Sequence, residues 1–183
     1  MLTSLQRRSG QLALLAAFSS GLAGATDPGW LYYGGDQGGR HYSSAAQIDR
    51  SNVNELEVAW VFRSGDMEMH PEEMANTSTQ STPILLPEAA GESLVYCTPF
   101  NRVIALDPAT GKQRWTFDPE IDRGGDRPFR CRGVSYAEQT ATPPGQACRH
   151  RLYMSSHDRR LWAIDATNGE PCTAFGEGGK VLL

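Results

Sequence analysis

The stretch ALDPATGKQRW (residues 105–115) joins a short apolar run, a turn built on Asp and Gly, and a Trp. The chain repeats this pattern in AIDATNGEPCT (residues 163–173). In both copies the Asp can accept hydrogen bonds from backbone N–H groups two residues later, and the Gly supplies a positive φ without steric cost. Each copy therefore predicts a tight turn between two strands.

The sequence around each turn repeats as well. SLVYCTPFNRVIALDPATGKQRWTF (residues 93–117) holds three apolar runs separated by polar turns, and RLYMSSHDRRLWAIDATNGEPCTAF (residues 151–175) has the same order. An ordinary hairpin explains one copy, but not two copies with matched flanks at a period of about 60 residues. We therefore predict an all-β fold, a β-propeller, with CRGVSYAE (residues 131–138) as the innermost strand of the second blade. The matched residues are Asp107 with Asp165, Gly111 with Gly169, and Phe117 with Phe175.

Composition excludes several classes of protein. The 183 residues are 39% hydrophobic and 21% charged, with 19 Gly, 11 Pro and a formal charge of -4, as in a turn-rich globular protein. No run of Lys or Arg is present, so we expect neither nucleic acid nor an anionic membrane surface as a partner. We also find no G-x-S-x-G elbow that would indicate a hydrolase.

Residues 1–25 are typical of a secretory signal peptide. Arg7 and Arg8 precede the apolar stretch LALLAAF (residues 12–18), and AGA (residues 23–25) offers the small residues of a cleavage site before Thr26. The apolar stretch is too short to span a bilayer. The alternative is an amphipathic N-terminal helix of the mature fold. We expect export to the periplasm, by a route that the sequence leaves open, and a mature domain over residues 26–183.

The Cys and His residues favour disulfides over a metal site. The four Cys form an even set without C-x-x-C spacing, which in an oxidising compartment predicts two disulfides. The four His are scattered, and no H-x-x-x-H pattern appears, so we expect no metal site within this segment.

The motif A-x-D-x-x-T-G-K-x-x-W, which residues 105–115 satisfy in full, resembles the tryptophan-docking motif of quinoprotein dehydrogenases. These enzymes are eight-bladed propellers that bind pyrroloquinoline quinone (PQQ). The second copy has Thr173 at the Trp position. The segment WLYYGGDQGGRHYSSAAQIDRSNVNELEVAWVFRSGD (residues 30–66) is similar to the N-terminal part of the family, and CRGVSY (residues 131–136) resembles its glucose, quinate and shikimate dehydrogenase branch.

The resemblance implies a cofactor site in this segment. PQQ is a flat ring system with three carboxylates, and Arg132 in CRGV occupies the family's position for pairing with one of them, beside Cys131 and Gly133. Gln80 stands where the family commonly has a glutamate near the cofactor, and a Gln can also hydrogen-bond a carboxylate. Ala137 stands where glucose dehydrogenases tend to have a histidine, and it cannot cover the ring. A solvated charge at a strand end is the alternative reading of Arg132.

The resemblance also implies an oxidoreductase that passes a hydride from a sugar, polyol or cyclitol hydroxyl to PQQ. The family's catalytic base and calcium ligands lie in later blades, so we expect no catalytic residue here and a segment of about two blades that is inactive alone. A membrane quinone or a cytochrome would accept the electrons. The alternative is a non-enzymatic periplasmic propeller that binds partner proteins through its loops.

Three disulfide pairings are possible for four Cys. In a propeller blade the strands alternate in direction, which places Cys97 and Cys131 towards the cofactor face and Cys148 and Cys172 on the opposite face. We therefore favour Cys97–Cys131 and Cys148–Cys172, with free buried thiols as the alternative.

Overall fold

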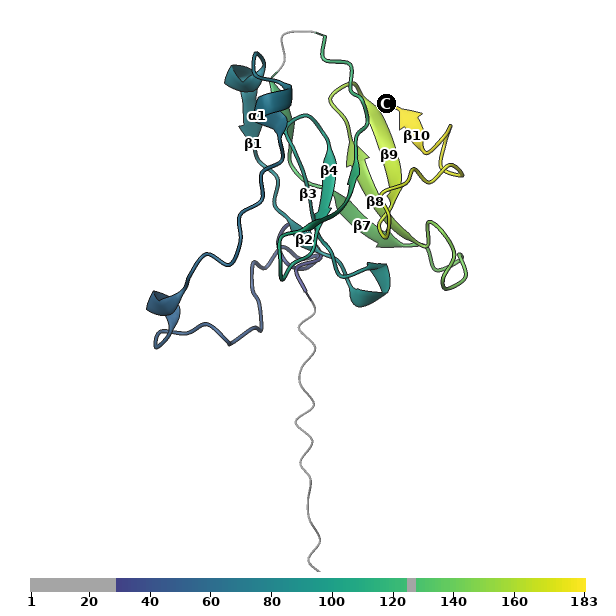
Figure 1. Cartoon of the computed structure of the whole chain (residues 1–183). Helices are drawn as coiled ribbons and strands as arrows, with labels where there is room; N and C mark the ends of the chain where they lie inside the picture. The colour runs from purple at the N-terminus through teal and green to yellow at the C-terminus, as the bar shows by residue number, and fades with distance from the viewer. Residues whose placement is uncertain (1–28, 125–127) are drawn as a thin grey trace, which may run out of the picture.

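The computed structural model describes residues 29–124 and 128–183, and within these ranges it contains two four-stranded antiparallel sheets. The two sheets lie side by side in the centre of the molecule (Figure 1). The helical elements of the described ranges lie in the connections: α1 (Asp66–Met69) and the 3-10 turns Val53–Glu55, Met74–Asn76 and Glu88–Ala90. The architecture is that of two neighbouring blades, as the all-β propeller prediction requires.

The first sheet is a meander whose strands follow one another in sequence. Its order is β2 (Ile84–Leu85), β3 (Leu94–Cys97), β4 (Val103–Leu106) and β5 (Gln113–Phe117). Every residue of β4 is buried, because this strand is central in the sheet and both of its faces are covered. The three apolar runs of residues 93–117 are thus β3, β4 and β5. The two-residue strand β2 was not predicted.

The second sheet repeats this order with β7 (Ser135–Glu138), β8 (His150–Ser155), β9 (Arg160–Asp165) and β10 (Lys180–Leu182). The prediction that residues 131–138 form the innermost strand is corrected at its start. Cys131 instead ends the short strand β6 (Phe129–Cys131), which pairs in parallel with β1 (Thr77–Thr79). The chain then bends at Gly133, whose φ is 154°, before β7 begins.

The repeat predicted over residues 151–175 does not end in a strand as the first copy does. Only Pro171 makes a bridge there, to Ile164, and the fourth strand of the blade is β10. The pairing with β9 continues on both sides of this bridge, because the Asp165 N–H donates to the Glu170 carbonyl oxygen and the Cys172 N–H donates to the Ala163 carbonyl oxygen. It ends where the chain turns after Cys172, whose carbonyl oxygen accepts from the Phe175 N–H at 2.8 Å. Phe175 therefore does not take the place of Phe117: its ring lies edge-on against Tyr153, with the ring centroids 5.6 Å apart.

Two tryptophans explain why the turn is repeated. A Cβ placed on Gly111 would lie 2.5 Å from the Trp60 ring, and a Cβ on Gly169 would lie 2.6 Å from the Trp115 ring. In each turn the face of a Trp ring from a preceding stretch of chain therefore packs directly on the Gly. Any other residue would place its Cβ too close to the ring atoms. Trp115 of the first blade docks in this way on the turn of the second.

The core lies between the two sheets. The buried cluster includes Val95 and Val103 of the first sheet and Leu152 and Ile164 of the second, each at most 1% exposed. Burial of apolar area here is the main force that holds the blades together.

Two disulfides tie the sheets to their connections. The structure contains Cys97–Cys131 and Cys148–Cys172, with Cα separations of 5.9 Å and 5.7 Å. These are the two pairs that the alternation of strand direction favoured.

The signal peptide predicted over residues 1–25 lies outside the described residues. In the part of the chain that the structure does describe, no helix is long and apolar enough to cross a membrane. The segment that precedes α1 reaches away from the two sheets (Figure 1) and exposes Leu56, Val58 and Val61.

Candidate functional site

The short parallel pair β1·β6 places two distant parts of the chain next to each other. Thr79 lies opposite Cys131 in its register. The residues that follow, Gln80 and Arg132, therefore leave the pair side by side. Both line one cavity of about 610 Å³, together with Gly133. Three of the four residues predicted to bind the cofactor are thus brought together.

The fourth predicted residue lies behind this cavity wall. Cys131 does not line the cavity: its side chain is 5% exposed and bonded to Cys97. Its sulfur lies 3.6 Å from the Gly133 carbonyl oxygen, so it contacts the wall from the side that faces the protein interior. Cys131 can hold Arg132 in place, but it does not offer a group to the cavity.

Arg132 supplies the cavity's positive charge. Its side chain is exposed, and it makes no hydrogen bond or ion pair with any residue of the described ranges. A guanidinium with five free donors matches the two oxygens of a carboxylate. Arg132 is therefore available to an anionic ligand.

Gln80 and Gly133 complete the polar part of the wall. Gln80 Nε2 donates to Ser78 Oγ at 3.2 Å, which orients the amide and leaves its second N–H to donate to a ligand. A Cβ on Gly133 would meet only the Thr82 carbonyl oxygen, at 4.0 Å. The absence of that Cβ lets a flat ligand approach the backbone closely.

Sequence reasoning missed three further lining residues: Tyr33, Val134 and Ser135. Tyr33 is 67% exposed and belongs to YYGGDQGGRHYS (residues 32–43), whose four glycines are the local signal that could have marked this stretch. Tyr33 and Val134 give the cavity apolar surface, which suits the face of a ring system. The residues present therefore fit one edge of PQQ, with one cation, one amide and an aromatic ring.

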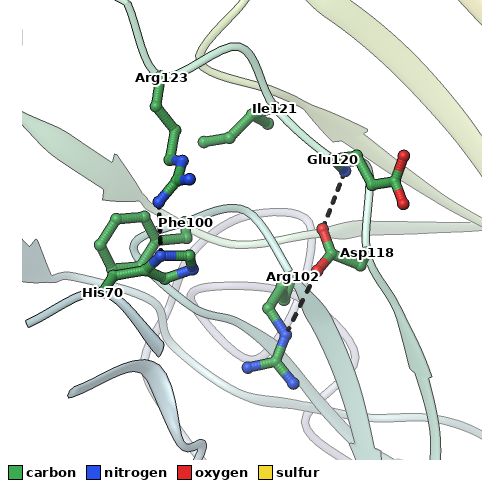
Figure 2. Close-up of a pocket in the computed structure, with 7 residues that line it drawn as sticks. All are labelled: His70, Phe100, Arg102, Asp118, Glu120, Ile121 and Arg123. Carbon is green, nitrogen blue, oxygen red and sulfur yellow. Dashed lines mark hydrogen bonds and ion pairs between the residues drawn. The ribbon is translucent and has the colours of Figure 1, made fainter. Parts of the chain in front are cut away.

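A second, smaller cavity of about 250 Å³ contains no predicted site residue (Figure 2). Its two guanidinium groups already have partners: Arg123 contacts His70 Nδ1 at 2.6 Å and Glu73 Oε1 at 2.8 Å, and Arg102 contacts Asp66 Oδ1 at 2.9 Å. Because these groups are already paired, this cavity has less capacity for a ligand than the one at Arg132. No group of three or more potential metal ligands occurs in the described ranges.

Comparison with known proteins identifies the family. The family model for the glucose/ethanol/alcohol dehydrogenase β-propeller domain, which carries the name PQQ, matches residues 30–183. The chain belongs to this family.

Curated members of the PQQ family include relatives in the branch that CRGVSY indicated. The chain is 37% identical over 183 residues to quinoprotein glucose dehydrogenase of Escherichia coli (strain K12), covering 97% of this chain and 22% of that protein. It is 34% identical over 169 residues to quinate/shikimate dehydrogenase (quinone) of Acinetobacter baylyi, covering 84% of this chain and 20% of that protein. The chain therefore spans about a fifth of the length of these relatives.

Solved structures agree on the fold of this PQQ-family chain. Quinohemoprotein alcohol dehydrogenase from Comamonas testosteroni superposes with a TM-score of 0.57 at 28% sequence identity. The match covers 78% of this chain and 18% of that one. The two sheets are thus two blades of a quinoprotein propeller.

Proposed function

We propose that this chain forms part of a periplasmic PQQ-dependent dehydrogenase that oxidises a hydroxyl of a sugar, polyol or cyclitol. The observation that carries the proposal is Arg132, a cation without a partner among the described residues, in a cavity that Gln80 and Gly133 also line. The named activities of the relatives, glucose and quinate/shikimate oxidation, support the substrate class.

In this proposal the chain's own residues bind and orient the cofactor. Arg132 pairs with one carboxylate, the second N–H of the Gln80 amide donates to the same edge of the ring system, and Tyr33 shields it from water. When bound, PQQ supplies the chemistry of hydride acceptance from an alcohol carbon. The protein holds the planar cofactor both at a carboxylate and at the face of the ring system. Its contribution at this edge is to fix the orientation of the cofactor.

The remaining parts of the site are proposed to come from residues outside this chain. These are the catalytic base, a calcium ion with its ligands, and the contacts that select the substrate. A membrane quinone or a cytochrome is the proposed electron acceptor.

The test is titration of PQQ into the whole enzyme with Arg132 replaced. R132A should weaken PQQ binding by about 1.5–3 kcal/mol, roughly 10- to 150-fold in Kd, the range for a hydrogen bond to a charged group. R132K should fall between R132A and the wild type, because Lys keeps the charge and loses the planar fork.

Arg130 provides the matched control. It is also exposed and lies two residues away in β6, but it does not line the cavity. R130A should leave the PQQ affinity unchanged within about twofold. An R132A variant that binds PQQ as tightly as the R130A variant would show that Arg132 has no role in the site.

A further inference from the structure

The two walls of the cofactor cavity are joined by very little backbone pairing. Gln80 follows β1 and Arg132 follows β6, and these strands pair over only three residues. No third strand joins them within the described ranges. A two-stranded pair of this length is marginally stable by itself. The separation of Gln80 and Arg132 must therefore be fixed by other contacts.

One buried residue contacts both walls. The Cys97 backbone N–H donates to Ser81 Oγ at 3.2 Å, and Ser81 directly follows Gln80. The Cys97 sulfur is bonded to Cys131, which directly precedes Arg132. Cys97 itself is 0% exposed at the end of β3 and belongs to the core cluster between the sheets. The rigid sheet thus holds each wall at the residue next to its cavity-lining side chain.

We propose that the Cys97–Cys131 disulfide and the Ser81 hydrogen bond are positioning devices for the cofactor. They set the distance between Gln80 and the Arg132 guanidinium, and hence the affinity for the carboxylate-bearing edge of PQQ. The inference rests on the proposed function. It assigns to a buried, chemically inert disulfide a role in ligand affinity, distinct from its effect on stability.

The second disulfide is a matched control. Cys148 and Cys172 both belong to the second blade, and neither lines the Arg132 cavity. The two bridges separate their Cys by 34 and 24 residues. Because loop-closure entropy depends only on the logarithm of loop length, removing either bridge should destabilise the protein by nearly the same amount. A difference in PQQ affinity between the two variants then reports positioning.

The experiment measures PQQ binding to the apo-enzyme by quenching of protein fluorescence. The C97A/C131A variant should raise the Kd for PQQ about tenfold or more, as expected when a hydrogen bond to a charged group is lost. The C148A/C172A variant should stay within about twofold of the wild type. Equal effects of the two variants would overturn the proposal and leave both bridges with a structural role alone.

A double-mutant cycle separates positioning from general loosening. If the bridge acts through Arg132, C97A/C131A should have little further effect on the Kd in the R132A background. Full additivity of the two changes would contradict the proposal. Failure of the wild type itself to bind PQQ would instead refute the proposed function.

A milder variant covers the case in which C97A/C131A does not fold. S81A removes only the hydrogen bond to Cys97 and should raise the Kd for PQQ about threefold. Its control is S93A, because Ser93 directly precedes β3 at the end away from Cys97 and its hydroxyl also makes hydrogen bonds, donating to the Gly91 carbonyl oxygen and accepting from the Arg114 guanidinium. An S81A variant with wild-type affinity would contradict the role of this contact.

Discussion

The two repeated turns have the same backbone and different surroundings. Gly111 N–H donates to the Asp107 carbonyl oxygen at 2.9 Å, and Gly169 N–H donates to the Asp165 carbonyl oxygen at the same distance. The Asp107 side chain, however, is 30% exposed and paired with Arg114, whereas Asp165 is 4% exposed and accepts from the Cys148 N–H at 2.5 Å. The local residues determine the turn, and the Cys148 loop of the same blade accounts for the deeper burial of Asp165.

The docked tryptophans differ in the same way. The Trp60 indole N–H donates to the Pro108 carbonyl oxygen at 3.1 Å. The Trp115 indole nitrogen is buried and has no partner in the described part of the chain. Both rings cover a Gly, so ring-to-backbone packing is the shared feature and the hydrogen bond is not.

The largest effect on stability should come from adding a Cβ to the Gly on which Trp115 packs. G169A places a Cβ 2.6 Å from the Trp115 ring at a φ of 82°, so it should lower the free energy of unfolding by about 2–4 kcal/mol in urea titrations. G145A is the control: Gly145 has a φ of 77° and nothing within 4 Å of the added Cβ, so it should cost only about 1 kcal/mol. Equal losses would show that backbone strain, and not Trp docking, explains the repeated Gly.

A smaller effect should separate the two tryptophans. W60F removes the hydrogen bond to Pro108, so it should lower the free energy of unfolding by about 1 kcal/mol more than W115F, which removes an indole N–H without a partner. Thermal or urea unfolding of the two variants measures the difference. A larger loss of stability in W115F than in W60F would contradict a stabilising role of the Trp60 hydrogen bond.

The smallest effect concerns the exposed Asp. Hydrogen bonds from the Arg114 and Thr110 side chains lower the pKa of Asp107 to about 2. A carboxyl whose pKa is depressed on folding stabilises the fold above its unfolded pKa, and this contribution is lost as the pH falls towards 2. R114A should raise the Asp107 pKa towards the value of a free Asp, measured by NMR titration of the carboxyl carbon. An unchanged pKa in R114A would show that the turn alone sets it.

Local sequence patterns predicted the parts of the fold that depend on local bonding. The apolar runs over residues 93–117 became β3, β4 and β5, because hairpin partners are adjacent in sequence. The end of the second repeat shows the limit: alignment with the first blade suggested a strand that ends at Phe175, but the chain turns after Cys172, whose carbonyl oxygen accepts from the Phe175 N–H. β2 was missed because two residues carry no periodicity.

The site depended on pairing that no local pattern reveals. The resemblance named Gln80 and Arg132 separately, but only the parallel register of β1 with β6 explains why they share a cavity. Tyr33 joins them from a third stretch of chain. Contacts of this kind are set by the packing of the sheets.

The β1·β6 pair also has a consequence for the order of folding. Each blade is a meander of neighbouring strands, whose short loops close with little loss of entropy. The β1·β6 pair joins segments about fifty residues apart, so these segments come together more slowly. The entropic cost of closing this long loop is offset only once both sheets have formed. We expect these three-residue strands to form last, with Cys97 reaching Cys131 only at that stage. Cofactor loading should then follow the assembly of the two blades and not guide it.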